Sequence, residues 1–175
     1  SWRLKNTDPV VKVTIIPRGK SLGASWYLPE EKQLRSESAF REHLIVTLGG
    51  RAAEELMLGE VSSGALDDLE KVTREAYMMV AFYGFNKKIG NISFYDSTGQ
   101  RDMSIQKPYS EETGKLIDEE SRKLINNAYE QAIELLKAHR TELEAIASAL
   151  LQKEILYKED LEVTELEYPI VLYLF

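Results

Sequence analysis

Two pairs of acidic residues stand on either side of a glycine-containing turn, and they are the side chains best suited to chemistry in this chain. Glu54-Glu55 follows a Gly49-Gly50 step, and Asp67-Asp68 follows Ser63-Gly64. The chain has no cysteine and only two histidines, so a common zinc site would need a carboxylate ligand. A metal-binding interpretation therefore depends on Asp68.

Each of these acids also has an ordinary structural role. An acidic residue in the first turn of a helix stabilises that helix, so helix capping is the leading alternative for Asp67 and Asp68. Glu54 and Glu55 lie on adjacent faces of one predicted helix, and the residues alone favour surface positions for both.

The histidines, His43 and His139, form no recognisable catalytic arrangement. No second histidine follows His43 at helical spacing, so we expect it on a helix surface or half-buried. His139 suits a helix cap or a cation that compensates the helix dipole. We find no Ser-His-Asp or Cys-His candidate and no glycine-rich nucleotide loop.

Helices are expected to position the acidic pairs. Apolar residues recur at helical spacing from Ser36 toward Gly59, and Gly49-Gly50 offers a place where another backbone could approach closely. A second helix is predicted from Leu66 to Tyr83-Gly84, with acids in its first turn.

Extended segments precede these helices and longer helices follow them. Val10 to Pro17 and Leu22 to Pro29 are predicted to pair as a small sheet, with the second segment at its edge. Residues 84–109 are expected to be a long, irregular connection. From Ser110, two long helices are predicted to form a hairpin around His139-Arg140, with a capping box at Thr141 starting the second helix. The fold class is therefore mainly α, with a small, hairpin-like N-terminal β-sheet and a C-terminal hairpin of long helices.

Composition narrows the possible partners. The length of 175 residues favours one domain, and the net charge of −7 with a pI near 5.0 argues against a nucleic-acid surface. The absence of cysteine fits a reducing compartment. We find no signal peptide and no apolar run near the roughly 20 residues of a spanning helix. Residues 166–175 form an apolar tail of unknown role, interpreted as a docking strand, a partner contact or an added remnant.

Five motifs follow one another in a fixed order. They are Val11 to Gly19, Trp26 to Glu31, Leu48 to Glu55, Ser63 to Leu69 and Lys107 to Glu111. Together they resemble the peptidase domain of FtsH-type proteases, which are membrane-anchored, ATP-dependent zinc proteases. The resemblance runs from about Asp8 to about Leu161, and the stretch from Asn91 to Gln100 is more similar to bacterial than to mitochondrial members.

The resemblance implies a zinc ion held by two histidines of a His-Glu-x-x-His helix and by an aspartate that corresponds to Asp68. It implies hydrolysis of a peptide bond by a water that the metal activates and from which the motif glutamate takes a proton. It also implies an edge strand along which an unfolded polypeptide substrate adds itself as a further strand. The residues of that strand are Leu22, Gly23, Ala24, Ser25 and Trp26.

The resemblance also implies partners and a location. Family members form hexamers, and ATP acts through an ATPase domain that would lie upstream. Membrane attachment is expected only through N-terminal segments absent from this chain. The implied location is the bacterial inner membrane with this domain on the cytoplasmic side, or alternatively the mitochondrial inner membrane. No nucleic-acid partner is expected.

The sequence departs from the family pattern at the zinc motif. His-Glu-x-x-His belongs immediately upstream of the segment matching Ser1 to Leu4 and is not in this chain. Residues 1–165 are therefore predicted to be a peptidase domain that lacks its zinc-motif helix, binds zinc poorly and is inactive alone. Glu55 is a candidate for orienting a metal ligand from outside the set of ligands, with helix packing or ion pairing as the alternative. The rival functions are a proteolytically inactive homologue that acts as an assembly or substrate-holding scaffold, and a purely structural helical module.

Overall fold

A computed structural model of the chain describes residues 3–17, 19, 23–28, 34–95 and 108–167, with side chains up to residue 162. Its contacts form two compact units. Leu34–Glu134 make one unit, and Ser1–Gln33 with Leu135–Phe175 make the other. This division does not test the peptidase domain predicted over residues 1–165, which stays a prediction, and the tail from residue 168 onward lies outside the described residues.

The unit Leu34–Glu134 begins with the predicted first helix, α1 (Glu37–Leu58). The side chain of Ser36 caps it by accepting a hydrogen bond from the Ala39 N–H, and it ends at Gly59, whose φ is 76°. Glycine suits this end because a left-handed backbone is strained for residues with a Cβ. Both predicted ends of α1 are confirmed.

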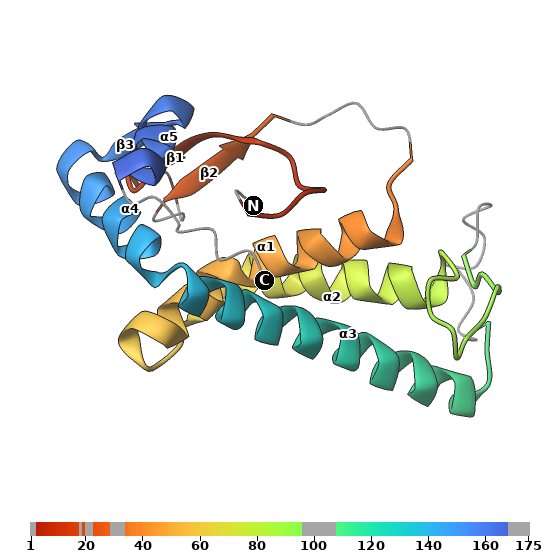
Figure 1. Cartoon of the computed structure of the whole chain (residues 1–175). Helices are drawn as coiled ribbons and strands as arrows, with labels where there is room; N and C mark the ends of the chain where they lie inside the picture. Colours follow the sequence, from red (N-terminus) through yellow and green to blue (C-terminus); the bar gives the residue numbers. More distant parts are fainter. Residues whose placement is uncertain (1–2, 18, 20–22, 29–33, 96–107, 168–175) are drawn as a thin grey trace. The chain divides into compact units, whose positions relative to one another are not determined.

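The second predicted helix is α2 (Leu66–Ala81), and a short 3₁₀ helix, η1 (Ser63–Ala65), leads into it. Helix α2 packs along α1 (Figure 1). The fully buried side chains at this contact come from apolar positions spaced as the sequence predicted: Leu44, Leu48, Val72 and Met79. Leu69, whose spacing on α2 matches that of Val72 and Met79, is instead 36% exposed.

Two further features of α1 concern residues singled out in the sequence. His43 is half-buried as expected, and its Nδ1 lies 2.6 Å from Oε2 of the buried Glu75 on α2. The expected close approach at Gly49-Gly50 is wrong within the described part of the chain. A Cβ built at either glycine would have no atom within 4 Å.

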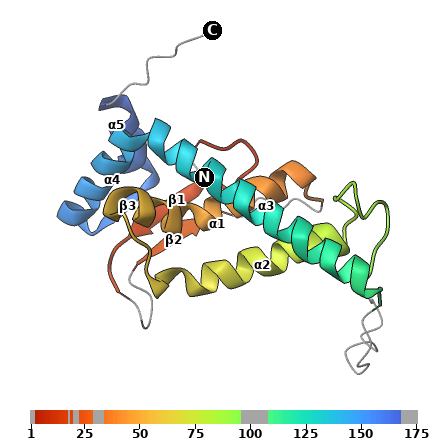
Figure 2. The same ribbon diagram turned by 90° about the horizontal axis from the view of Figure 1, so that it is seen from below.

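After α2 the chain is irregular, as predicted, through the described residues 82–95. Residues 96–107 lie outside the description. Helix α3 (Glu111–Ala138) follows, and Ser110 caps its start because Oγ accepts a hydrogen bond from the Thr113 N–H at 3.2 Å. A core cluster joins the end of α2 to α3 through Val80, Ala81, Ile89 and Ile117. Figure 2 shows these helices from below.

Ser121 on α3 gives a first testable prediction. Its side chain is 1% exposed, and its Oγ has no hydrogen-bond partner among the described residues. A buried hydroxyl without a partner is destabilising, so Ser121→Ala is expected to raise the free energy of unfolding by about 1 kcal/mol. Urea unfolding measures the change. The same substitution at Ser110 removes a cap and should lower stability by about 1 kcal/mol, so equal effects at the two serines would contradict the prediction.

An ion-pair network ties the turn after α2 to α3. The carboxylate of Glu120 accepts hydrogen bonds from Lys88 Nζ at 2.7 Å, Lys123 Nζ at 2.9 Å and Asn86 Nδ2 at 3.0 Å. These bonds, with Lys88 the largest influence, lower the pKa of Glu120 to about 2. The charged carboxylate is therefore favoured by folding.

This shift predicts how the stability of the protein depends on pH. Because the folded pKa of Glu120 lies below its ordinary value of 4.5, its stabilising effect is fully present above about pH 4.5 and is lost as pH falls toward about 2. The difference in unfolding free energy between the wild type and Glu120→Gln should shrink over this range. Urea titrations at a series of pH values measure it. Glu130→Gln, at an exposed position of α3, is the control, and a difference that stays constant with pH would contradict the assignment.

The other unit contains a small antiparallel sheet in the order β2-β1-β3. Strand β1 is Val10–Thr14 and β2 is Ala24–Tyr27, so the predicted pairing and the edge position of the second strand are confirmed. The third strand, β3 (Ile155–Tyr157), pairs with β1 and was not predicted. Three residues are too few to show an alternating pattern, so no local pattern indicates β3.

Two helices flank β3 in the sequence. Helix α4 (Arg140–Lys153) begins after a single intervening residue, His139, and α5 (Lys158–Glu167) follows β3. The predicted capping box at Thr141 is wrong, because His139 occupies the N-cap and Thr141 lies inside the helix. Nδ1 of His139 lies 3.1 Å from Oε1 of Glu142.

The core of this unit lies between the sheet and these helices. Its buried residues are Val10, Leu150, Leu156 and Leu161. The observed architecture is therefore mainly α with one small sheet, as predicted. Among the described residues, no helix is both long and apolar enough to cross a bilayer.

Candidate metal centre

Asp68 lies in the first turn of α2 with a carboxylate that is accessible to a ligand. Its side chain is 45% exposed, and its Oδ1 lies 3.6 Å from Nζ of Lys71. The N-cap position belongs to Ala65, which makes no side-chain capping bond. Asp68 therefore contributes its charge to the helix end without occupying the N-cap, and its carboxylate is half-exposed beside Lys71.

The turn before Asp68 is held to α1 by two side chains. Glu54 Oε2 accepts a hydrogen bond from the Ser62 N–H at 2.9 Å, and Arg51 Nη1 donates to the Ser62 carbonyl at 3.5 Å. Ser62 in turn caps η1, because its Oγ accepts from the Gly64 N–H at 3.2 Å. Hydrogen bonding from the Ser62 side chain, and then from its backbone, lowers the pKa of Glu54. Glu54 thus fixes the segment that leads to Asp68.

Glu55, the candidate for orienting a metal ligand, contacts helix α3. Its carboxylate accepts a hydrogen bond from the hydroxyl of Tyr129 on α3. Burial, followed by this bond, raises the pKa of Tyr129 to about 12. The contact gives Glu55 a structural role between α1 and α3, and a role in orienting a metal ligand stays a prediction.

The donor set near Asp68 suits one ligand of a metal site rather than a whole site. Within the described residues, no group of three or more His, Cys, Asp or Glu side chains could hold a metal ion. An exposed carboxylate at a helix start is a suitable oxygen donor for zinc. The remaining donors of a tetrahedral site would have to come from residues outside this set.

The predicted substrate strand lies in the other unit. Ala24, Ser25 and Trp26 are in β2, Gly23 precedes it, and Leu22 lies outside the described residues. Strand β2 pairs with β1 on one side and is the last strand of the sheet on the other. Lys12 of β1 places its Nζ 4.6 Å from the ring centroid of Trp26. The backbone of β2 is thus arranged as a sheet edge, to which an extended peptide could add.

Comparison with known proteins shows the family of this chain. A protein-family model described as peptidase family M41 matches residues 1–164. The chain belongs to peptidase family M41. The resemblance drawn from the five sequence motifs is therefore confirmed.

Two of the three relatives compared below are named as ATP-dependent zinc metalloproteases. The chain is 51% identical to the ATP-dependent zinc metalloprotease FtsH of Parabacteroides distasonis, over 93% of this chain and 24% of that protein. It is 46% identical to FtsH of Karelsulcia muelleri, over 91% of this chain and 26% of the relative. It is also 46% identical to the mitochondrial inner membrane m-AAA protease component AFG3L2 of Mus musculus, over 91% and 20%. The chain thus spans between 20% and 26% of the length of these relatives.

Sequence reasoning missed the residues that hold the turn at Ser62, which precedes Asp68. Arg51 and Glu54 are three positions apart on α1 and reach the same residue, Ser62. The Ser62-Ser63-Gly64 sequence is a helix-start signature that could have indicated a cap. The bond from Tyr129 to Glu55 had no local signal, since 74 positions separate the two residues.

Proposed function

We propose that this chain is the peptidase portion of an ATP-dependent zinc endopeptidase and that Asp68 is one of its zinc ligands. The observation that carries the proposal is the carboxylate of Asp68, which is half-exposed and does not serve as the N-cap of α2, in a chain of peptidase family M41. The other two ligands and the general base would come from a His-Glu-x-x-His helix of the longer protein. That motif is not in the given sequence.

Residues of this chain would bind the metal and position its ligand. Asp68 would donate a carboxylate oxygen to the metal, and Arg51 and Glu54 would keep the Ser62 turn in place so that the first turn of α2 is fixed. Zinc, when bound, supplies an activated water and a Lewis acid for the peptide carbonyl. Leu66, in the same first turn of α2, is 71% exposed and offers an apolar side chain against which a further helix could pack.

The substrate proposed for this site is an unfolded polypeptide. Residues Gly23 to Trp26 would hold it by main-chain hydrogen bonds along β2, the edge strand of the sheet, which selects an extended backbone with little regard to sequence. We further propose that the full protein is a hexamer, that ATP acts through an upstream ATPase domain, and that N-terminal segments anchor it in the bacterial inner membrane with this domain on the cytoplasmic side. The mitochondrial inner membrane is the alternative location.

The experiment uses the longer protein with the upstream helix and the ATPase portion. We expect about one zinc per chain by metal analysis and ATP-dependent hydrolysis of casein, both lost on chelation and restored by zinc. The chain as given is expected to bind zinc weakly and hydrolyse nothing. Absence of zinc and activity in the longer protein, with an intact motif, would favour the alternative of an inactive assembly or substrate-holding scaffold.

A further inference from the structure

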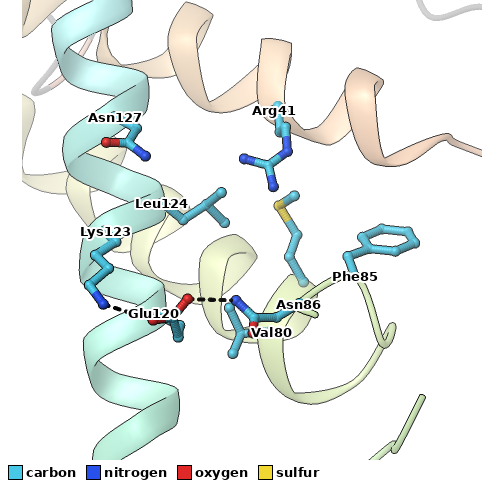
Figure 3. Close-up of a pocket in the computed structure, with 9 residues that line it drawn as sticks. Arg41, Val80, Phe85, Asn86, Glu120, Lys123, Leu124 and Asn127 are labelled. Atoms are coloured by element: carbon cyan, nitrogen blue, oxygen red, sulfur yellow. Dashed lines mark hydrogen bonds and ion pairs between the residues drawn. The ribbon is translucent and has the colours of Figure 1, made fainter. Parts of the chain in front are cut away.

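A second site lies in the unit Leu34–Glu134, at a small pocket of about 160 Å³ between α1, the end of α2 and α3. Figure 3 shows its lining residues, which combine apolar side chains, here called the floor, with cationic and amide side chains, here called the rim. The floor includes Met79, Phe85 and Leu124, and the rim includes Arg41, Lys123 and Asn127. None of the acidic residues around Asp68 lines it.

Among the described residues that line the pocket, Glu120 is the only carboxylate, and its oxygens already accept hydrogen bonds. It accepts hydrogen bonds from Lys88, Lys123 and Asn86. These donors hold its charge and occupy its oxygens, so it has little capacity left for a ligand cation. The pocket therefore favours groups that accept hydrogen bonds or carry negative charge.

Arg41 is the main donor left for such a group. Its Nε and Nη2 both donate to a single oxygen, Oε1 of Glu37, at 2.8 and 2.6 Å. Its Nη1 makes no hydrogen bond to the described residues, and the guanidinium points from α1 toward the pocket (Figure 3). The side-chain amide of Asn127 likewise has no partner within the described part of the chain and faces the same space. A planar guanidinium beside an amide N–H₂ is well suited to bind a carboxylate.

The size of the pocket limits what can accompany that carboxylate. Cofactor and drug-sized ligands occupy roughly 300–1,000 Å³, which exceeds this volume. A cavity of about 150 Å³ can admit a ring the size of benzene. The floor of Met79, Phe85 and Leu124 would bury one apolar group of this size and stabilise it by removing its surface from water.

We infer that this pocket binds a carboxylate attached to one apolar group, with the size of a single amino-acid residue. The C-terminal residue of a polypeptide and a free carboxylic acid both present this chemistry. The carboxylate would lie against Arg41 and Asn127, and the apolar group against the floor. Binding requires no metal at Asp68, so it can be tested without zinc, and its failure would leave the proposed peptidase function untouched.

The test is an NMR titration of the 175-residue chain with N-acetyl-leucine and with N-acetyl-leucinamide. The second compound has the same side chain and acetyl group, but an uncharged amide replaces the carboxylate. We expect the acid, in the millimolar range, to shift the amide signals of Phe85, Leu124 and Asn127, and the amide compound to bind about tenfold more weakly. A short peptide ending in leucine identifies the source. Tighter binding of the peptide acid than of N-acetyl-leucine assigns a polypeptide C-terminus, and equal binding assigns a free acid.

Three variants separate recognition from a general effect of charge or folding. Arg41→Gln should weaken binding about tenfold. Glu37→Gln frees the guanidinium and should leave binding unchanged or strengthen it, whereas a merely structural role for the pair would weaken binding in both variants. Arg74→Gln removes one exposed cation from α2 without touching the pocket and should have no effect. Equal binding of acid and amide, no shifts at the pocket, or equal weakening by Arg41→Gln and Arg74→Gln would overturn the inference.

Discussion

Asp68→Ala is expected to abolish zinc binding and casein hydrolysis in the longer protein that carries the upstream motif. Removal of one of three protein ligands leaves the metal with too few donors for a stable tetrahedral site, and we expect its affinity to fall by more than roughly 100-fold. The fold should survive, because the side chain is half-exposed and makes no capping bond. Metal analysis after dialysis against a weak chelator measures the loss, and circular dichroism checks the fold.

Matched variants at neighbouring positions make this result specific. Asp67→Ala removes the adjacent acid in the same first turn and should keep full zinc content. Lys71→Gln removes the cation paired with Asp68 and should keep or increase zinc affinity, because a competing positive charge is lost. A normal zinc content in Asp68→Ala would rule out its assignment as a ligand.

Gly23→Ala is expected to impair peptide hydrolysis while leaving zinc content unchanged. A Cβ at Gly23 would lie 2.7 Å from the backbone oxygen of Thr14. That oxygen cannot move freely, because Thr14 is buried and its Oγ1 donates to the Glu154 carbonyl at 2.8 Å. The start of β2 must therefore shift away from β1 at a cost of about 1–3 kcal/mol. If β2 holds the substrate, hydrolysis should fall by about tenfold or more.

A matched glycine gives the control for this substitution. Gly50 lies inside α1, and a Cβ built there meets no atom within 4 Å. In the 175-residue chain, Gly50→Ala should raise the free energy of unfolding by about 0.5–1 kcal/mol, since alanine favours the helix. Urea unfolding should show that the free energy of unfolding falls in Gly23→Ala and rises in Gly50→Ala. Unchanged hydrolysis in a folded Gly23→Ala variant would exclude β2 as the substrate strand.

Local patterns predicted the helices because each carries its own signals. Ser36 and Gly59 bound an apolar stripe that marks α1, and Ser110 marks the start of α3. Contacts between distant segments have no such local signal. The pairing of β3 with β1 joins residues more than 100 positions apart, and the start of α4 is set by its junction with α3 rather than by Thr141.

The candidate site was less predictable from local patterns than the helices were. Spacing alone favoured a capping role for Asp68, and only the family resemblance singled it out as a ligand. The structure adds what neither could provide, namely that Arg51 and Glu54 meet at Ser62 and that Glu55 contacts Tyr129. Such contacts depend on how α1 is placed against the turn at Ser62 and against α3. Side-chain spacing within one helix does not encode that placement.

The pairing of β1 with β3 also bears on the order in which the chain acquires structure during synthesis. Thr14 bonds to Glu154 across 140 positions, so the first strand cannot complete its sheet until the ribosome has released nearly all of these residues. Leu34–Glu134, which forms a compact unit from one continuous segment, can form its core earlier. Domains generally fold as units while synthesis proceeds, and closing a long loop costs entropy before its contacts form. The strand edge that would receive substrate is therefore expected to be among the last parts of a nascent chain to become ordered.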